Sequence, residues 1–313
     1  MELPYRLIII CGLHRSGTTY LGKILSKNPN VQVINETSNP EFGVKGVPIC
    51  YPYISLTNMD GSDLRGQLFK DIVTFKRAWS RKAGPKANVR RRFLLWIIGG
   101  RNGFHWMQIK MRSFLGTLPE FICLKDPFLT FSAGYFAKQY KAKVICMIRH
   151  PGAFYASVAK QIWHFDINNL LSQQDLINDY GQDIPEKYWN CAKTNNVASL
   201  AILWKVMARV INGASSKYDN VITLKHEDLC IIPILSTQKV CQHFTLDFTE
   251  DMNCFIKNTT QADTAEAPDG IVHWFRRNSS ALVDSWRERL KPEDAHLLQE
   301  IIGDELYLFY EKW

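Results

Sequence analysis

Short runs of apolar residues alternate with amphipathic stretches along most of the chain, and this alternation predicts the fold. The apolar runs suit strands buried on both faces, and we expect five, at residues 6–11, 31–34, 121–124, 143–148 and 221–224. Helical periodicity follows them, and helices are expected at residues 18–27, 64–79, from about 127 to 140, from about 151 to 164, and around 197–211. Strands that alternate with helices indicate an α/β protein, a three-layer parallel sheet with helices on both faces.

Two stretches do not follow this alternation. Residues 41 to about 120 hold turn clusters and a basic run around one helical segment, and residues 165–193 have the polarity of an insertion. The C-terminal third is expected to be mainly helical.

Composition narrows the class of protein. The chain has 313 residues, enough to bury a large core without disulfides or metal ions. Its 38 Lys and Arg against 30 Asp and Glu give a net charge of +8, which points to an anionic partner. No apolar run reaches the roughly 18 residues that a membrane span needs. Eight cysteines without a C-x-x-C pair are typical of buried thiols in a reducing compartment, so we expect a soluble, cytoplasmic protein.

A glycine-rich loop follows the first predicted strand, with the sequence GLHRSGTT at residues 12–19. Gly12 and Gly17 permit a turn that directs backbone N–H groups toward an anion at the start of the next helix. The spacing matches a Walker A loop except that Thr18 stands in place of the Lys that holds the phosphates of ATP or GTP. Arg15 supplies the cation instead. The loop residues expected to hold a phosphate are His14, Arg15, Ser16, Gly17, Thr18 and Thr19.

The segment GLHRSGTTYL resembles the 5′-phosphosulfate-binding loop of the sulfotransferases that use 3′-phosphoadenosine-5′-phosphosulfate (PAPS). A second segment, VICMIRHPGAFYAS, is similar to the 3′-phosphate-binding motif of that family, with Arg149 at a strand end and Ser157 in the following helix. A guanidinium and a hydroxyl near a helix start suit a terminal phosphate. The resemblance implies a P-loop-like sulfotransferase fold in a single domain over residues 1–313, with an acceptor-binding insertion at about 42–120. It also implies PAPS as co-substrate, PAP as product, and no metal.

Two weaker matches extend the resemblance. KHEDL at residues 225–229 looks like the family's YEDL segment near the adenine, with His226 in place of Tyr. A helix start with solvated charges is the other interpretation. The segment from Phe275 to Leu290 resembles the family's F-x-R-K-G…W-K segment over the 3′-phosphate, which makes Arg276 and Arg277 candidate contacts.

The catalytic residues are expected by resemblance to the protein-tyrosine branch of the family. The His that serves as base in the cytosolic branch is missing, because Pro127 stands at its place. The protein-tyrosine branch instead has a Glu before Thr, and KDPF with a Lys that assists the leaving group. Glu36 and Lys125 occupy these places, so we expect Glu36 as general base, and Lys125 with Arg15 as electrostatic stabilisers. The alternative for Glu36 is a loop carboxylate that pairs with Arg15 or caps a helix, and the alternative for Lys125 is a structural ion pair.

Several interpretations stay open. His105 and His164 are other candidate bases, and the basic run at residues 77–92 could guide an anionic acceptor or form a solvated helix face. A P-loop small-molecule kinase and a non-catalytic protein that binds a nucleotide or sulfated ligand are the competing functions. No nucleic-acid-binding signature is present. The acceptor is expected to be a glycan or a small natural product, and the oligomeric state is left open.

Overall fold

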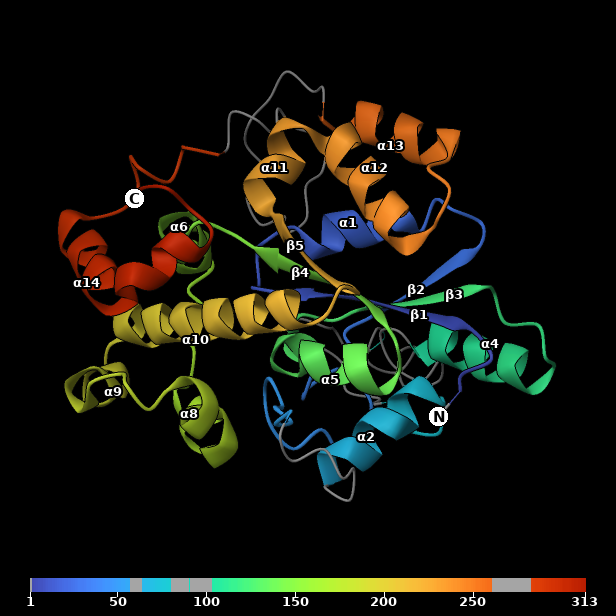
Figure 1. Cartoon of the computed structure of the whole chain (residues 1–313), viewed down its shortest axis with the longest axis horizontal. Helices are drawn as coiled ribbons and strands as arrows, with labels where there is room; N and C mark the ends of the chain where they lie inside the picture. Colours follow the sequence, from blue (N-terminus) through green and yellow to red (C-terminus); the bar gives the residue numbers. More distant parts are fainter. Residues whose placement is uncertain (1, 57–63, 80–89, 91–102, 261–282) are drawn as a thin grey trace.

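Five parallel strands form the central sheet. The computed structural model describes residues 2–56, 64–79, 90, 103–260 and 283–313 (Figure 1). The strands are β1 (Arg6–Gly12), β2 (Val31–Asn35), β3 (Phe121–Lys125), β4 (Lys143–Ile148) and β5 (Val221–Lys225), in the order β2-β3-β1-β4-β5. All five predicted strands are confirmed, and every one but β4 is one residue longer at its carboxyl end than the pattern predicted.

Helices cover both faces of this sheet, as the sequence predicted. Side chains of β1 alternate between the faces: Ile8 and Ile10 pack in one core cluster, and Leu7 and Ile9 in another. Figure 1 shows α1 (Thr18–Leu25), α11 (His226–Ile231), α12 (Pro233–Phe244) and α13 (Glu250–Thr260) on one face. The other face carries α2 (Leu64–Val73), α4 (Gly103–Phe114), α5 (Ala133–Gln139) and α10 (Asn196–Lys217). The three-layer α/β class is confirmed.

Several helix ends differ from the predicted ones. The helix α2 ends before Phe75, and α6 (Pro151–Ala159) ends before Ile162; both of these residues have positive φ, which an α-helix does not accommodate. The segment after β3 begins as a 3₁₀-helix, η1 (Pro127–Ser132), before it continues as α5. The helix α4 has no counterpart among the predicted elements.

The stretch at residues 165–193 is helical and contributes to the core, which its polarity did not predict. It forms α7 (Asn168–Leu171), α8 (Gln174–Tyr180) and α9 (Glu186–Ala192). Leu170, Leu176 and Trp189 are buried in the same core cluster as α10. The apolar side chains of this stretch lie on the inner face of the three helices and pack in that cluster, although the average polarity of the stretch is high.

The described C-terminal residues are mainly helical, as predicted, and include α14 (Pro292–Ile302) and η3 (Gly303–Leu308). Among the described residues, α10 is the one helix long and apolar enough to cross a bilayer, and most of that apolar stretch is buried inside the protein.

Because all strands are parallel, their carboxyl ends meet at one edge. Functional side chains of parallel α/β proteins gather at such an edge.

Candidate active site

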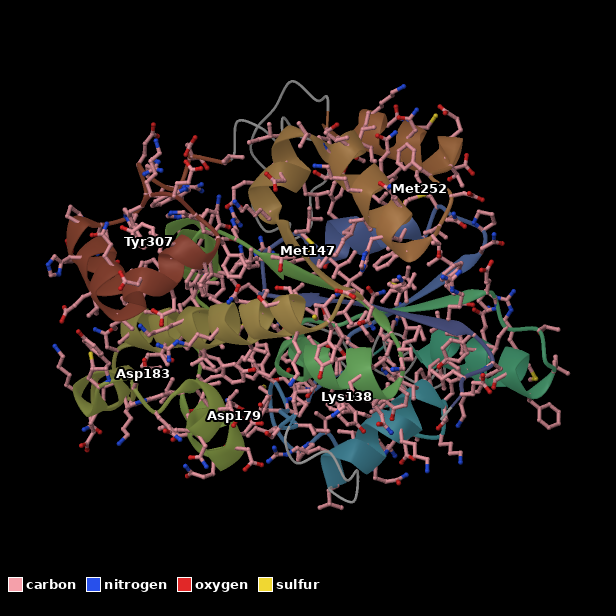
Figure 2. The ribbon with its side chains drawn as sticks, in the orientation of Figure 1. Lys138, Met147, Asp179, Asp183, Met252 and Tyr307 are labelled. Atoms are coloured by element: carbon pink, nitrogen blue, oxygen red, sulfur yellow. The ribbon has the colours of Figure 1, made fainter. Side chains whose placement is uncertain are left out.

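The loop between β1 and α1 has the backbone of an anion-binding turn. Gly12, Arg15 and Gly17 have φ of 125°, 64° and 91°. A Cβ on Gly12 would lie 2.0 Å from the carbonyl oxygen of Met147 in β4, so only glycine fits there. Figure 2 labels Met147 near the middle of the molecule. In the described part of the chain no side chain caps the start of α1, which leaves its first N–H groups directed at the loop.

Glu36 and Lys125 form an ion pair at the carboxyl ends of β2 and β3. Lys125 Nζ donates to Glu36 Oε1 at 2.8 Å, and Asn39 Nδ2 donates to Oε2 at 3.0 Å. The side chain of Lys125 is 2% exposed and that of Glu36 is 37% exposed. Burial alone would raise the pKa of Glu36, but the charge and hydrogen bond of Lys125 outweigh it and lower this pKa to about 2. Glu36 is therefore an ionised carboxylate at neutral pH.

Asp126 fixes the loop that carries Glu36. Its carboxylate is fully buried and accepts hydrogen bonds from Thr37 Oγ1 at 2.8 Å, from the Ser38 N–H at 2.6 Å and from the Phe128 N–H at 3.1 Å. Burial raises the pKa of Asp126 to about 6, although these hydrogen bonds oppose the rise. The sequence did not single out Asp126 for this role. It binds the turn after β2 to the end of β3 and sets the position of Glu36.

The second motif contacts the first. Arg15 Nε donates to Ser157 Oγ at 3.2 Å, and Arg149 Nη1 donates to the Arg15 carbonyl at 2.9 Å. The carbonyl of Arg149 accepts from Trp204 Nε1 of α10 at 2.9 Å. Two segments about 130 residues apart in the sequence thus meet side by side at the carboxyl ends of β1 and β4.

Trp286 packs against the start of α6. Its ring stacks on His150 with centroids 4.7 Å apart, and a Cβ on Gly152 would lie 2.2 Å from a ring carbon of Trp286. Glu227 joins the same place: its carboxylate accepts from the His150 N–H at 3.0 Å and from the Tyr310 hydroxyl at 2.9 Å. The KHEDL segment does begin α11, as its alternative interpretation predicted, but the Glu227 carboxylate is hydrogen-bonded within the protein rather than merely solvated. The pairing of Gly152 with Trp286 was missed because nothing in the local sequence signals it.

Aromatic side chains surround His14. Its ring centroid lies 4.8 Å from that of Phe128 and 5.3 Å from that of Trp163, and its Nδ1 contacts the hydroxyl of Tyr51. Burial raises the pKa of Tyr51, so its hydroxyl keeps its proton. Burial also lowers the pKa of His14 to about 4, so the imidazole is neutral at pH 7 and carries one N–H donor.

Some of the remaining candidate site residues lie in the described part of the chain, and others lie outside it. Ser16 and Thr18 are buried in the loop, Thr19 is half-buried, His226 is buried and its ring contacts Cys230 Sγ, and His164 is exposed. Arg276 and Arg277 lie outside the described residues, as do most of residues 77–92 and the side chain of His105. The described residues contain no group of three or more His, Cys, Asp or Glu arranged to hold a metal ion.

Known proteins resemble this chain. The protein-family model of the sulfotransferase domain matches residues 6–310 of this chain. Similar solved structures include sulfotransferase STF9 from Mycobacterium avium (12% identity, TM-score 0.47, 98% of this chain and 78% of that chain). Mouse sulfotransferase SULT7A1 complexed with PAP is similar at 12% identity and a TM-score of 0.42, over 96% of this chain and 87% of that chain. No curated protein matches the sequence. Because the domain match spans nearly the whole chain, this protein belongs to the sulfotransferase family.

Proposed function

We propose that this protein transfers the sulfuryl group of PAPS to a hydroxyl or amine of a glycan or small natural-product acceptor, with Glu36 as general base. The observation that carries the proposal is the 2.8 Å pair of Glu36 and Lys125 at the sheet edge that also bears the anion-binding loop. Sulfuryl transfer needs a base for the acceptor proton and cations for the charge on the leaving phosphate. Both are present at this edge.

The donor would lie across the two motifs. The 5′-phosphosulfate would accept hydrogen bonds from the loop, from His14 through Thr19, at the uncapped start of α1. The 3′-phosphate would bind beside Arg149 and Ser157, with Arg276 and Arg277 as further contacts. The hydrogen bond between Arg15 and Ser157 supports this arrangement, because it makes the two phosphate sites neighbours.

The chemical step uses Glu36 and Lys125 in complementary ways. The acceptor O–H or N–H gives its proton to the Glu36 carboxylate while its oxygen or nitrogen attacks sulfur. The bond between sulfur and the 5′-phosphate oxygen breaks, and the phosphate leaves as part of PAP with an added negative charge. Lys125 and Arg15 stabilise that charge.

Donor binding would also activate the base. With a pKa of about 2, Glu36 is too weak a base while it holds Lys125. An anionic donor competes for the Lys125 ammonium, which removes the main cause of the low pKa and adds negative charge nearby. Both changes raise the basicity of Glu36. We therefore expect the donor to bind before the acceptor reacts.

The acceptor would contact the ring of Trp163, which is half-buried beside His14. Tyr51, from the stretch assigned to acceptor binding at about residues 42–120, is buried and contacts His14 through its hydroxyl. An aromatic face of this kind suits the ring of a sugar or of a phenolic compound. We place the enzyme in the cytoplasm, because all eight cysteines lie in the described part of the chain and none forms a disulfide.

A comparison of PAP with ATP tests the donor. In EDTA, PAP should raise the melting temperature more than ATP with Mg²⁺ does in a parallel sample. Equal or greater stabilisation by ATP would favour a small-molecule kinase. For the base, Glu36→Gln should abolish transfer of labelled sulfate from PAPS while PAP affinity is kept or increased, because Lys125 no longer pairs with Glu36. Full activity in this variant would remove Glu36 from the mechanism, and a parent that binds PAP but sulfates no acceptor would favour a non-catalytic binding protein.

A further inference from the structure

The helix α4 exposes an apolar stripe that the fold does not use. Met107, Met111, Phe114 and Leu115 are 56%, 57%, 86% and 61% exposed. Their spacing of four, three and one residues places them along one face of the helix and its last turn. The opposite face holds α4 to the protein through buried residues, among them Trp106 and Ile109. We call these four exposed residues the α4 stripe.

Cations border the α4 stripe. Lys110 lies between the stripe and the buried face, and Arg112 lies on the far side; both are exposed, and Arg112 Nη1 also donates to Gln32 at 2.8 Å. An apolar helix face flanked by long basic side chains is typical of helices that lie in a membrane interface, where the cations reach lipid phosphates.

The charge of the chain is concentrated in the same region of sequence. Residues 72–119 hold 11 of the 38 Lys and Arg and none of the 30 Asp and Glu. The remainder, with 27 basic against 30 acidic residues, is net negative, so this region accounts for the whole positive charge of the protein. A long stretch without a carboxylate suits a diffuse anionic surface.

We propose that the α4 stripe docks this protein onto a bilayer rich in anionic phospholipids. Phe114, Leu115, Met107 and Met111 enter the interface, and Lys110 with Arg112 binds the headgroups. A second copy of the chain is a poor occupant, because the cations that border the two stripes would meet and repel each other.

Docking in this way leaves the candidate active site open. Gln32, which Arg112 contacts, is the second residue of β2, whereas Glu36 follows the other end of that strand. Figure 1 shows α4 at the end of the molecule opposite α6 and α14. Changes in the α4 stripe should therefore not alter donor binding.

Cosedimentation of the full chain with vesicles tests the proposal. Vesicles of phosphatidylcholine with about 30% phosphatidylserine should bind the protein, and vesicles of phosphatidylcholine alone should bind it at least about tenfold more weakly. Raising the salt to about 0.5 M should weaken the binding, because it screens the headgroup charge. Met107→Ser with Phe114→Ser, and separately Lys110→Glu, should each weaken it by about tenfold or more.

The control carries Ile231→Ser and Leu235→Ser, two other apolar side chains that are 56% and 48% exposed. It should bind vesicles like the parent, and every variant should keep the PAP-induced rise in melting temperature. Failure of the parent to bind, or an equal loss in the control, would overturn the proposal. It would also be overturned if the parent were a dimer that the Met107 and Phe114 variant dissociates, since the stripe would then be a self-association face.

Discussion

Replacing Glu36 by Gln should destabilise the unliganded protein, because it leaves the buried Lys125 ammonium without its ion-pair partner. Burial opposes ionisation of Glu36, yet Lys125 brings the pKa to about 2, a fall that corresponds to about 3 kcal/mol. The carboxylate is 37% exposed, so solvent screens part of this energy, and we expect a loss of about 2 kcal/mol. In a chain of this size that lowers the melting temperature by about 3–5 °C.

A double-mutant cycle measures the pair directly. Lys125→Met keeps the buried aliphatic volume, so the variant with both changes should recover most of the stability that Glu36→Gln loses. Urea unfolding of the four proteins should give a coupling energy of about 2 kcal/mol. Glu300→Gln, in the exposed 3.1 Å pair with Lys187, is the matched control and should leave the melting temperature unchanged. Simple addition of the two single effects would refute the reasoning.

The pH dependence gives a second check on the same pair. The pKa of Glu36 is lower in the folded than in the unfolded protein, so its contribution is fully present above about pH 4.5 and is lost as the pH falls toward about 2. The stability difference between parent and Glu36→Gln should be constant from about pH 5 to 8 and shrink below about pH 4.5. A difference that grows on acidification would contradict the assignment.

Three other changes probe the rest of the site. Arg149→Ala should weaken PAP binding by about 1.5–3 kcal/mol in calorimetry, the scale of a charge-assisted hydrogen bond, and an unchanged affinity would remove it from the donor site. Gly152→Ala should lower the free energy of unfolding by about 1–3 kcal/mol, because its Cβ would lie 2.2 Å from the Trp286 ring, and Trp286→Leu should relieve part of that loss. Asp126→Ala should cost about 2–4 kcal/mol in urea unfolding, because three buried donors lose their acceptor; its kcat should fall more than its PAP affinity.

The sequence by itself determined the sheet and the start of the site. Apolar runs of β-type residues specify strands wherever they occur, so the five strands follow from local pattern. The loop from Gly12 to Thr19 is equally local, because glycine spacing and a following helix suffice to build an anion-binding turn. Glu36 and Lys125 were found through resemblance of short motifs, and the structure brings them within 2.8 Å.

Only the tertiary structure determined the properties that depend on residues distant in the sequence. The low pKa of Glu36 arises from a lysine 89 residues away, and the hydroxyl that contacts His14 belongs to Tyr51, 37 residues away. Residues 165–193 became part of the core because three short helices share one inner face. The apolar residues of α4 could have been core by composition, and only packing left four of them at the surface. Local sequence pattern determines the secondary structure of a segment. The pKa of a side chain and its burial or exposure depend on the neighbours that the tertiary structure places around it.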